Sequence, residues 1–111
     1  MRGTILAALL AGTLLAAIGQ VAFKVGATGR DSLLSFLNGW IAFGLITYAL
    51  GTILWIFALS RVNLTLVYPF TALTFVLVYG LGIAVLGETV SATALVGVGL
   101  VLLGLLLISI A

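Results

Sequence analysis

The sequence predicts an all-α integral membrane protein, a bundle of four transmembrane helices. Of its 111 residues, 65% are hydrophobic and only 5% are charged, and the mean hydropathy is +1.52. A soluble domain carries about 25% charged residues, so this chain could not give a globule a polar surface. A spanning helix needs about 20 apolar residues. The length therefore allows four spans and little else, and we expect one transmembrane domain over residues 1–111.

The first helix is expected over residues 4–25. Its apolar run starts shortly after Arg2 and reaches Val25. This run is longer than the apolar core of a secretory signal peptide, so we expect it to be retained as a span. Polar residues at 26–31 end the helix, and the glycines among them permit turn conformations. A short interfacial helix through Leu37 can follow, capped by the residue at 31 or 32.

Three more helices are expected over residues 39–59, 64–86 and 92–110. Asn38 and Ser91 precede the second and fourth of them and are plausible N-caps. Because the last two connections are short, the second, third and fourth helices should be antiparallel neighbours.

Positive charge does not decide the orientation in the membrane. With four spans, Arg2 and Arg61 lie at the end that carries the termini, and Lys24 and Arg30 lie at the other. The positive-inside rule compares the number of positive residues at the two ends, and here each end has two. Three interpretations remain: insertion both ways up to give an antiparallel dimer, an orientation fixed by a partner subunit, or one fixed by other features.

Composition argues against several functions. The chain has no cysteine and no histidine, which removes disulfides and the usual metal ligands, so we expect no metal and no cofactor. A net charge of +2 without a basic stripe does not suit nucleic acid. Side chains for acid–base or nucleophilic work are nearly absent, and no nucleotide-binding loop is present, so we expect no enzyme. The two acidic residues, Asp31 and Glu88, lie outside the spans, which disfavours a buried proton-binding acid.

Polar residues within the spans mark candidate binding positions because they are costly in hydrocarbon. On the first helix, Gln20 and Lys24 continue a face that begins at Thr13. Lys24 either extends to the headgroups or binds an anion at the mouth of a cavity, and Gln20 carries the polar face inward.

The second and third helices add polar and aromatic candidates. Tyr68, Thr71 and Thr74 open the third helix beside Pro69, which either kinks it or occupies a tolerated first turn. Tyr68 is alternatively an interfacial anchor. On the second helix, Tyr48 and Trp55 lie along one side with two glycines, and they either pack or line a cavity.

Glu88 is expected at the start of the fourth helix, where a carboxylate interacts favourably with the helix dipole and can pair with Lys24 at the same end. Gly97 and Gly104, seven residues apart, predict a face for close helix association. Spacing alone does not say whether that face joins subunits or packs within one bundle.

Several of these residues, in this order, resemble the four-helix branch of the drug/metabolite transporter superfamily (EamA-like and small multidrug resistance-like proteins), and most closely the subunits of the aminoarabinose-phosphoundecaprenol flippase. The matching positions are Gly19-Gln20 with Lys24, Leu54-Trp55, Val67-Tyr68-Pro69, and Glu88 with Ser91. The small multidrug resistance proteins are similar in the Gly97/Gly104 pair, which in that family lies at a dimer interface. Their membrane-embedded glutamate is replaced here by Ala16, so proton-coupled drug export is not expected.

The resemblance implies an inner-membrane transporter of a polyprenyl-phosphate-linked sugar or related anionic lipid. It further implies a homodimer or a heterodimer with a related four-helix subunit. Residues 20, 24, 68, 71 and 74 would then furnish a polar groove, with Lys24 and either Arg30 or Arg61 receiving the phosphate. Two alternatives stay open: a small-molecule exporter, and a non-transporting assembly subunit of a membrane complex.

Overall fold

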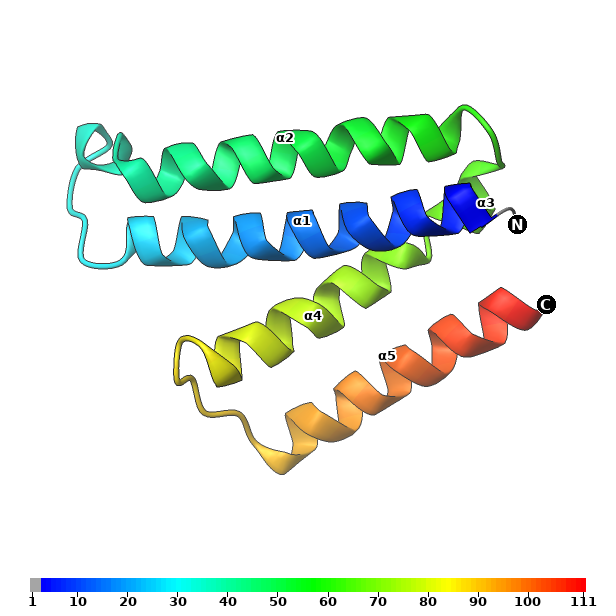
Figure 1. The fold of residues 1–111 in the computed structure, drawn as a ribbon. Coiled ribbons are helices and arrows are strands. Elements are labelled where there is room, and N and C mark those ends of the chain that lie inside the picture. Colours follow the sequence, from blue (N-terminus) through cyan, green and yellow to red (C-terminus); the bar gives the residue numbers. More distant parts are fainter. Residues whose placement is uncertain (1–2) are drawn as a thin grey trace.

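The computed structural model describes residues 3–111, in which the chain runs back and forth as helices (Figure 1). The elements in order are α1 (Gly3–Ala27), the 3-10 turn η1 (Leu34–Phe36), α2 (Gly39–Leu59), α3 (Leu64–Val67), α4 (Phe70–Ala84) and α5 (Ala92–Ile110). Four segments are long and apolar enough to span a bilayer, with α3 and α4 together forming the third. The predicted all-α membrane fold class is confirmed. Arg2, counted above for orientation, lies outside the described residues.

The helices α1 and α2 form a close antiparallel pair because glycines face each other along their contact (Figure 1). A Cβ added at Gly51 would lie 2.9 Å from the carbonyl oxygen of Gly12, and one at Gly44 would lie 2.9 Å from that of Gly19. Real Cβ atoms do not come this close, so only glycine permits the approach. We call these four residues the glycine seam.

Two side chains cap helices as the sequence suggested. The side-chain oxygen of Asn38 accepts hydrogen bonds from the backbone amides of Trp40 and Ile41, at 3.0 and 3.1 Å. Its Nδ2 also donates to the carbonyl of Gly26 at 3.0 Å, which fastens the start of α2 to the end of α1. Ser91 accepts from the Ala94 amide at 3.1 Å and so caps α5.

The third span differs from the single helix predicted over 64–86. Helix α3 ends at Val67, and α4 begins at Phe70, so Tyr68 and Pro69 form a break. Proline has no amide hydrogen to continue the helical ladder, which explains the break. Beyond it, α4 packs mainly against α1, while α2 contacts α3. The expectation that the second and third spans are neighbours therefore holds only for the short α3.

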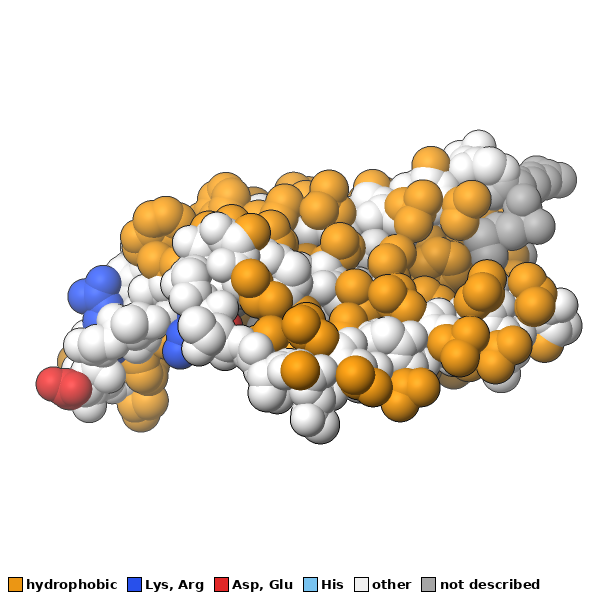
Figure 2. All heavy atoms as spheres, turned by 90° about the horizontal axis from the view of Figure 1, so that it is seen from below, with side chains coloured by type: hydrophobic (Ala, Val, Ile, Leu, Met, Phe, Trp, Pro, Cys, Tyr) orange, Lys and Arg blue, Asp and Glu red, His pale blue; other side chains and the backbone are white. Residues whose placement is uncertain are grey.

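The last helix, α5, lies at the edge of the bundle beside α4 (Figure 1). None of its residues is buried. The compact core is small and consists of Ile5, Leu9, Ala58 and Val67. Hydrophobic side chains cover much of the face seen in Figure 2, and the charged side chains visible there gather at one end. This distribution suits a protein whose solvent is lipid along its length and water at its ends.

The connection between α1 and α2 carries an exposed apolar segment. Leu33, Leu34 and Leu37 are 84%, 79% and 80% exposed. The short interfacial helix expected here is reduced to the single turn η1, and no side chain caps it.

Candidate functional site

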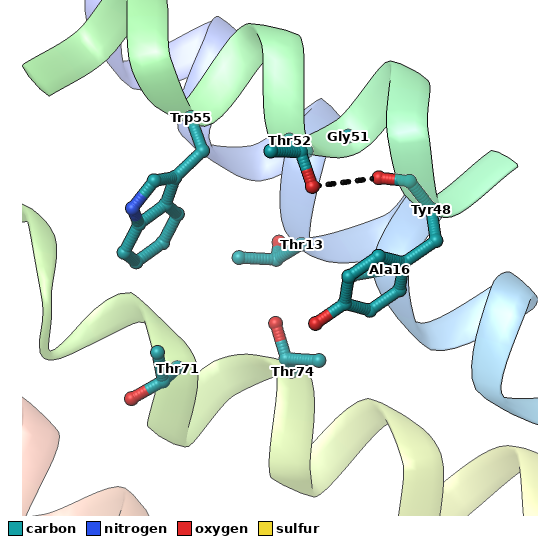
Figure 3. Close-up of a pocket in the computed structure, with 9 residues that line it drawn as sticks. Thr13, Ala16, Tyr48, Gly51, Thr52, Trp55, Thr71 and Thr74 are labelled. Carbon is teal, nitrogen blue, oxygen red and sulfur yellow. Dashed lines mark hydrogen bonds between the residues drawn. The ribbon is translucent and has the colours of Figure 1, made fainter. Parts of the chain in front are cut away.

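A cavity of about 300 Å³ lies between α1, α2 and α4 and is the strongest candidate site (Figure 3). Nine residues line this central cavity: Gly12, Thr13 and Ala16 from α1; Tyr48, Gly51, Thr52 and Trp55 from α2; Thr71 and Thr74 from α4. None of the nine is charged. The predicted candidates that it brings together are Tyr48, Trp55, Thr71 and Thr74.

Three of the lining threonines donate their hydroxyl hydrogens to backbone carbonyls one turn earlier in the chain. Thr13 donates to the Leu10 carbonyl at 2.8 Å, Thr52 to that of Tyr48 at 2.9 Å, and Thr71 to that of Tyr68 at 2.8 Å. Such bonds satisfy the hydroxyl hydrogen within a span and leave lone pairs for another donor.

Two hydroxyls and one indole form no hydrogen bond with residues 3–111 and are available to a ligand. Figure 3 shows the Tyr48 phenol and the Thr74 hydroxyl pointing toward one another at one side of the cavity, with the Trp55 ring at the other side. The one hydrogen bond drawn among the nine residues runs from Thr52 to the Tyr48 backbone, so both of those hydroxyls stay available. Uncharged hydroxyls beside aromatic faces suit a sugar or another neutral polar group better than a bare anion.

Lys24 lies away from the central cavity. It lines a second cavity of about 360 Å³ with Val25, Thr28, Leu86 and Glu88. We call this the charged cavity. Gln20 lines neither cavity, but on α1 it is one turn from Ala16 in the first and one turn from Lys24 in the second. Gln20 itself is exposed, so the polar residues predicted on the first helix do not line one cavity: Thr13 lines the first and Lys24 the second.

Tyr68 and Glu88 differ from expectation. Tyr68 is 62% exposed at the break between α3 and α4 and does not line the central cavity. Glu88 does not cap α5, because Ser91 lies nearer to the first turn and does so. Within residues 3–111, no carboxylate oxygen lies within 4.0 Å of a lysine or arginine nitrogen, so the expected Lys24–Glu88 pair is not formed.

Gly97 and Gly104 lie on the half-buried side of α5. A Cβ added at either would meet nothing within 4 Å. In contrast to the glycine seam, these two glycines have no helix of this chain packed closely on them.

Sequence reasoning missed the part of the cavity wall that Thr52 and Gly12 form. It also placed Thr13 on a polar face without assigning it to the site. The spacing of Tyr48, Thr52 and Trp55, four and then three residues, puts them on one helical face and could have revealed Thr52.

Fold and site together define a small multi-pass membrane protein with a cavity, lined by hydroxyl and aromatic side chains, between three of its spans. The chain is 31% identical over 101 residues to the probable 4-amino-4-deoxy-L-arabinose-phosphoundecaprenol flippase subunit ArnE of Pseudomonas savastanoi pv. phaseolicola, covering 86% of this chain and 89% of that protein. The ArnE subunit of Yersinia pestis (strain Pestoides F) is 30% identical over 105 residues, covering 91% and 92%. A subunit named ArnF, from Erwinia tasmaniensis, is 40% identical over 67 residues, covering 59% of this chain and 53% of its own length.

The chain belongs to the family of aminoarabinose-phosphoundecaprenol flippase subunits, which confirms the resemblance noted from its motifs. No family model and no solved structure matches it.

Proposed function

We propose that this chain is a subunit of an inner-membrane flippase that moves a polyprenyl-phosphate-linked sugar, of the kind named for its relatives, between leaflets. The observation that carries the proposal is the central cavity, whose free hydroxyls and aromatic rings lie among spans otherwise covered by hydrocarbon side chains. In this role the chain is a transporter and not an enzyme.

A flippase must give a polar headgroup a path that avoids bare hydrocarbon. Tyr48 and Thr74 would donate hydrogen bonds to sugar hydroxyls, and the Trp55 ring would lie against the sugar's apolar face. The prenyl chain needs no enclosure, because exposed leucines and isoleucines along the helices allow it to stay in lipid. Gln20 would receive the headgroup as it passes between the two cavities.

A second subunit would complete the path. Helix α5 has no buried residue, and Gly97 and Gly104 leave room for a helix from a partner, either an identical chain or a related four-helix subunit. Transport would come from one bundle rocking against the other, without ATP hydrolysis. The exporter alternative is weaker, because the central cavity contains no carboxylate for a cation.

Transport in reconstituted liposomes tests this proposal. The protein, with any subunit that co-purifies, would be given a short-chain prenyl-phosphate aminoarabinose in one leaflet, and its arrival in the other would be followed. We expect Thr74→Val and Tyr48→Phe each to slow flipping about fivefold, because each removes a hydrogen bond worth roughly 1 kcal/mol. The matched control is Thr65→Val on α3, outside both cavities, which should flip at the wild-type rate.

The proposal fails if the wild-type protein flips nothing, or if Thr74→Val and Thr65→Val behave alike. Proton-coupled uptake of an organic cation would instead identify an exporter. Co-purification with a larger membrane enzyme and no transport would identify an assembly subunit.

A further inference from the structure

The charged cavity contains two opposite charges that do not neutralise each other. Lys24 comes from the last turn of α1, and Glu88 from the connection between α4 and α5. Both line the same cavity of about 360 Å³, yet no salt bridge joins them in the part of the chain that the structure describes. Two unpaired opposite charges around one space leave a binding position for each sign.

Glu88 is held in place by the backbone around it. Gly87 has a positive φ of 68°, which turns the chain back toward α4. The Glu88 amide then donates to the Gly82 carbonyl at 3.1 Å. A Cβ added at Gly82 would lie 2.9 Å from Glu88 Oε1, so the carboxylate rests against the bare backbone of that glycine. The backbone of Glu88 is thus fastened to α4, and its exposed carboxylate lies beside Gly82 without a cation within salt-bridge distance in residues 3–111.

Lys24 is held on the other side of the cavity by the end of α1. Its carbonyl accepts bonds from the hydroxyl and the amide of Thr28, at 2.6 and 3.1 Å, which continue the helix to that residue. The ammonium group itself is on a flexible stem and remains exposed. Lys24 can therefore adjust to a ligand, and Glu88 offers a carboxylate on a backbone that is fastened to α4.

We propose that the charged cavity binds a zwitterionic lipid headgroup, in which Lys24 binds the phosphate and Glu88 binds an ammonium group on the sugar. This inference rests on the proposed function, because it assigns a role to a second site on the same path. A purely anionic headgroup would be repelled by the carboxylate of Glu88. A purely cationic headgroup would be repelled by the ammonium group of Lys24. A headgroup with a phosphate at one end of a sugar ring and an amine at the other satisfies both residues. Glu88 is then the residue that selects for the amine.

Two substrates that differ only in the amine test the selection. One probe is a short-chain prenyl phosphate bearing 4-amino-4-deoxy-L-arabinose, and the other bears L-arabinose with a hydroxyl in place of the amine. Competition for transport in liposomes gives the preference of each variant. We expect Glu88→Gln to weaken the preference for the amino sugar about tenfold, since it removes one charge-assisted contact. Glu88→Asp, which keeps the charge, should retain most of the preference.

Two further variants separate charge from position. Gly82→Ala should displace the Glu88 carboxylate and weaken the preference several-fold without any change of charge. Asp31→Asn removes an exposed carboxylate that lines neither cavity, and should leave the preference unchanged. Lys24→Gln should slow both probes equally, because both carry the phosphate.

The outcomes distinguish this inference from the proposed function. If wild-type protein transports both probes but Glu88→Gln alters them by the same factor, Glu88 has a structural role and the inference is overturned while the flippase stands. The same holds if the wild type shows no preference between the probes. If neither probe is transported, it is the flippase proposal that fails.

Discussion

At the scale of single residues, glycines have two different roles in this protein. Those of the seam are in close backbone contact, whereas Gly80 of α4 has nothing within 4 Å of an added Cβ. A Cβ at Gly51 would lie 2.9 Å from the backbone oxygen of Gly12, and backbone cannot turn aside as a flexible side chain can. The cost of an added methyl group therefore depends on which helix carries the glycine.

We predict that Gly51→Ala destabilises the protein by about 1–3 kcal/mol, because α1 and α2 must separate to admit the methyl group. The matched control is Gly80→Ala, which should be neutral or stabilise by about 0.5–1 kcal/mol, since alanine favours helix in an open position. Unfolding in detergent by denaturant titration measures both. Equal unfolding midpoints for the two variants would contradict the claim that the glycine seam has no room for a methyl group.

At the scale of elements, the connection between α1 and α2 contains leucines where a water-exposed loop would carry polar residues. Asn38 fastens α2 to the end of α1, which holds the segment 33–37 at the end of the spans. Its leucines are about four-fifths exposed, and burying apolar surface gains about 25 cal/mol per Å². The element is therefore suited to lie in the interfacial layer of the bilayer.

A spin label placed on this segment tests the assignment. The native chain has no cysteine, so Leu34→Cys provides a unique attachment point. We expect a label there to collide more often with oxygen, which concentrates in lipid, than with a water-soluble nickel complex. A label at Ser32→Cys, two residues earlier, should show the reverse order. Equal accessibility to the nickel complex at both positions would place the leucines in water.

The elements also show what sequence can and cannot predict. The four spans follow from apolar run length, a local property, and the Asn38 and Ser91 caps follow from residue type. The packing of α4 on α1 does not follow, because it depends on the direction the chain takes after the break at Pro69. For the same reason, the sequence grouped Lys24 with Thr71 and Thr74 by chemistry, whereas the structure assigns Lys24 to a different cavity.

At the scale of the whole molecule, the bundle is incomplete on one side. Helix α1 has nine buried residues and α5 has none. The central cavity lies between only three spans, and the fourth span does not line it, so we propose that a second subunit docks on the bundle. The names of the relatives, which describe subunits, agree with this proposal.

Native mass spectrometry can test which face of α5 associates. We predict that Gly97→Val abolishes most of the dimer, because Gly97 shares one helical stripe with Gly104, seven residues on, and a valine there would fill the space proposed for a partner helix. Gly99→Val changes the same residue type two positions away, on a different face of the same helix, and should dimerise like the wild type. Dimers that persist equally in both variants would rule out the Gly97 and Gly104 face.

The glycine seam has a consequence for how the central cavity can change shape. Gly12 and Gly51 belong to both the seam and the cavity lining, so there the wall is main chain. Two backbones in direct contact have no side-chain rotamers that could change to fit a substrate of another size. A change in the width of the central cavity at that point must come from the opposite side, which α4 forms. Because α4 follows the break at Pro69, the tilt of α4 would set the width of the cavity.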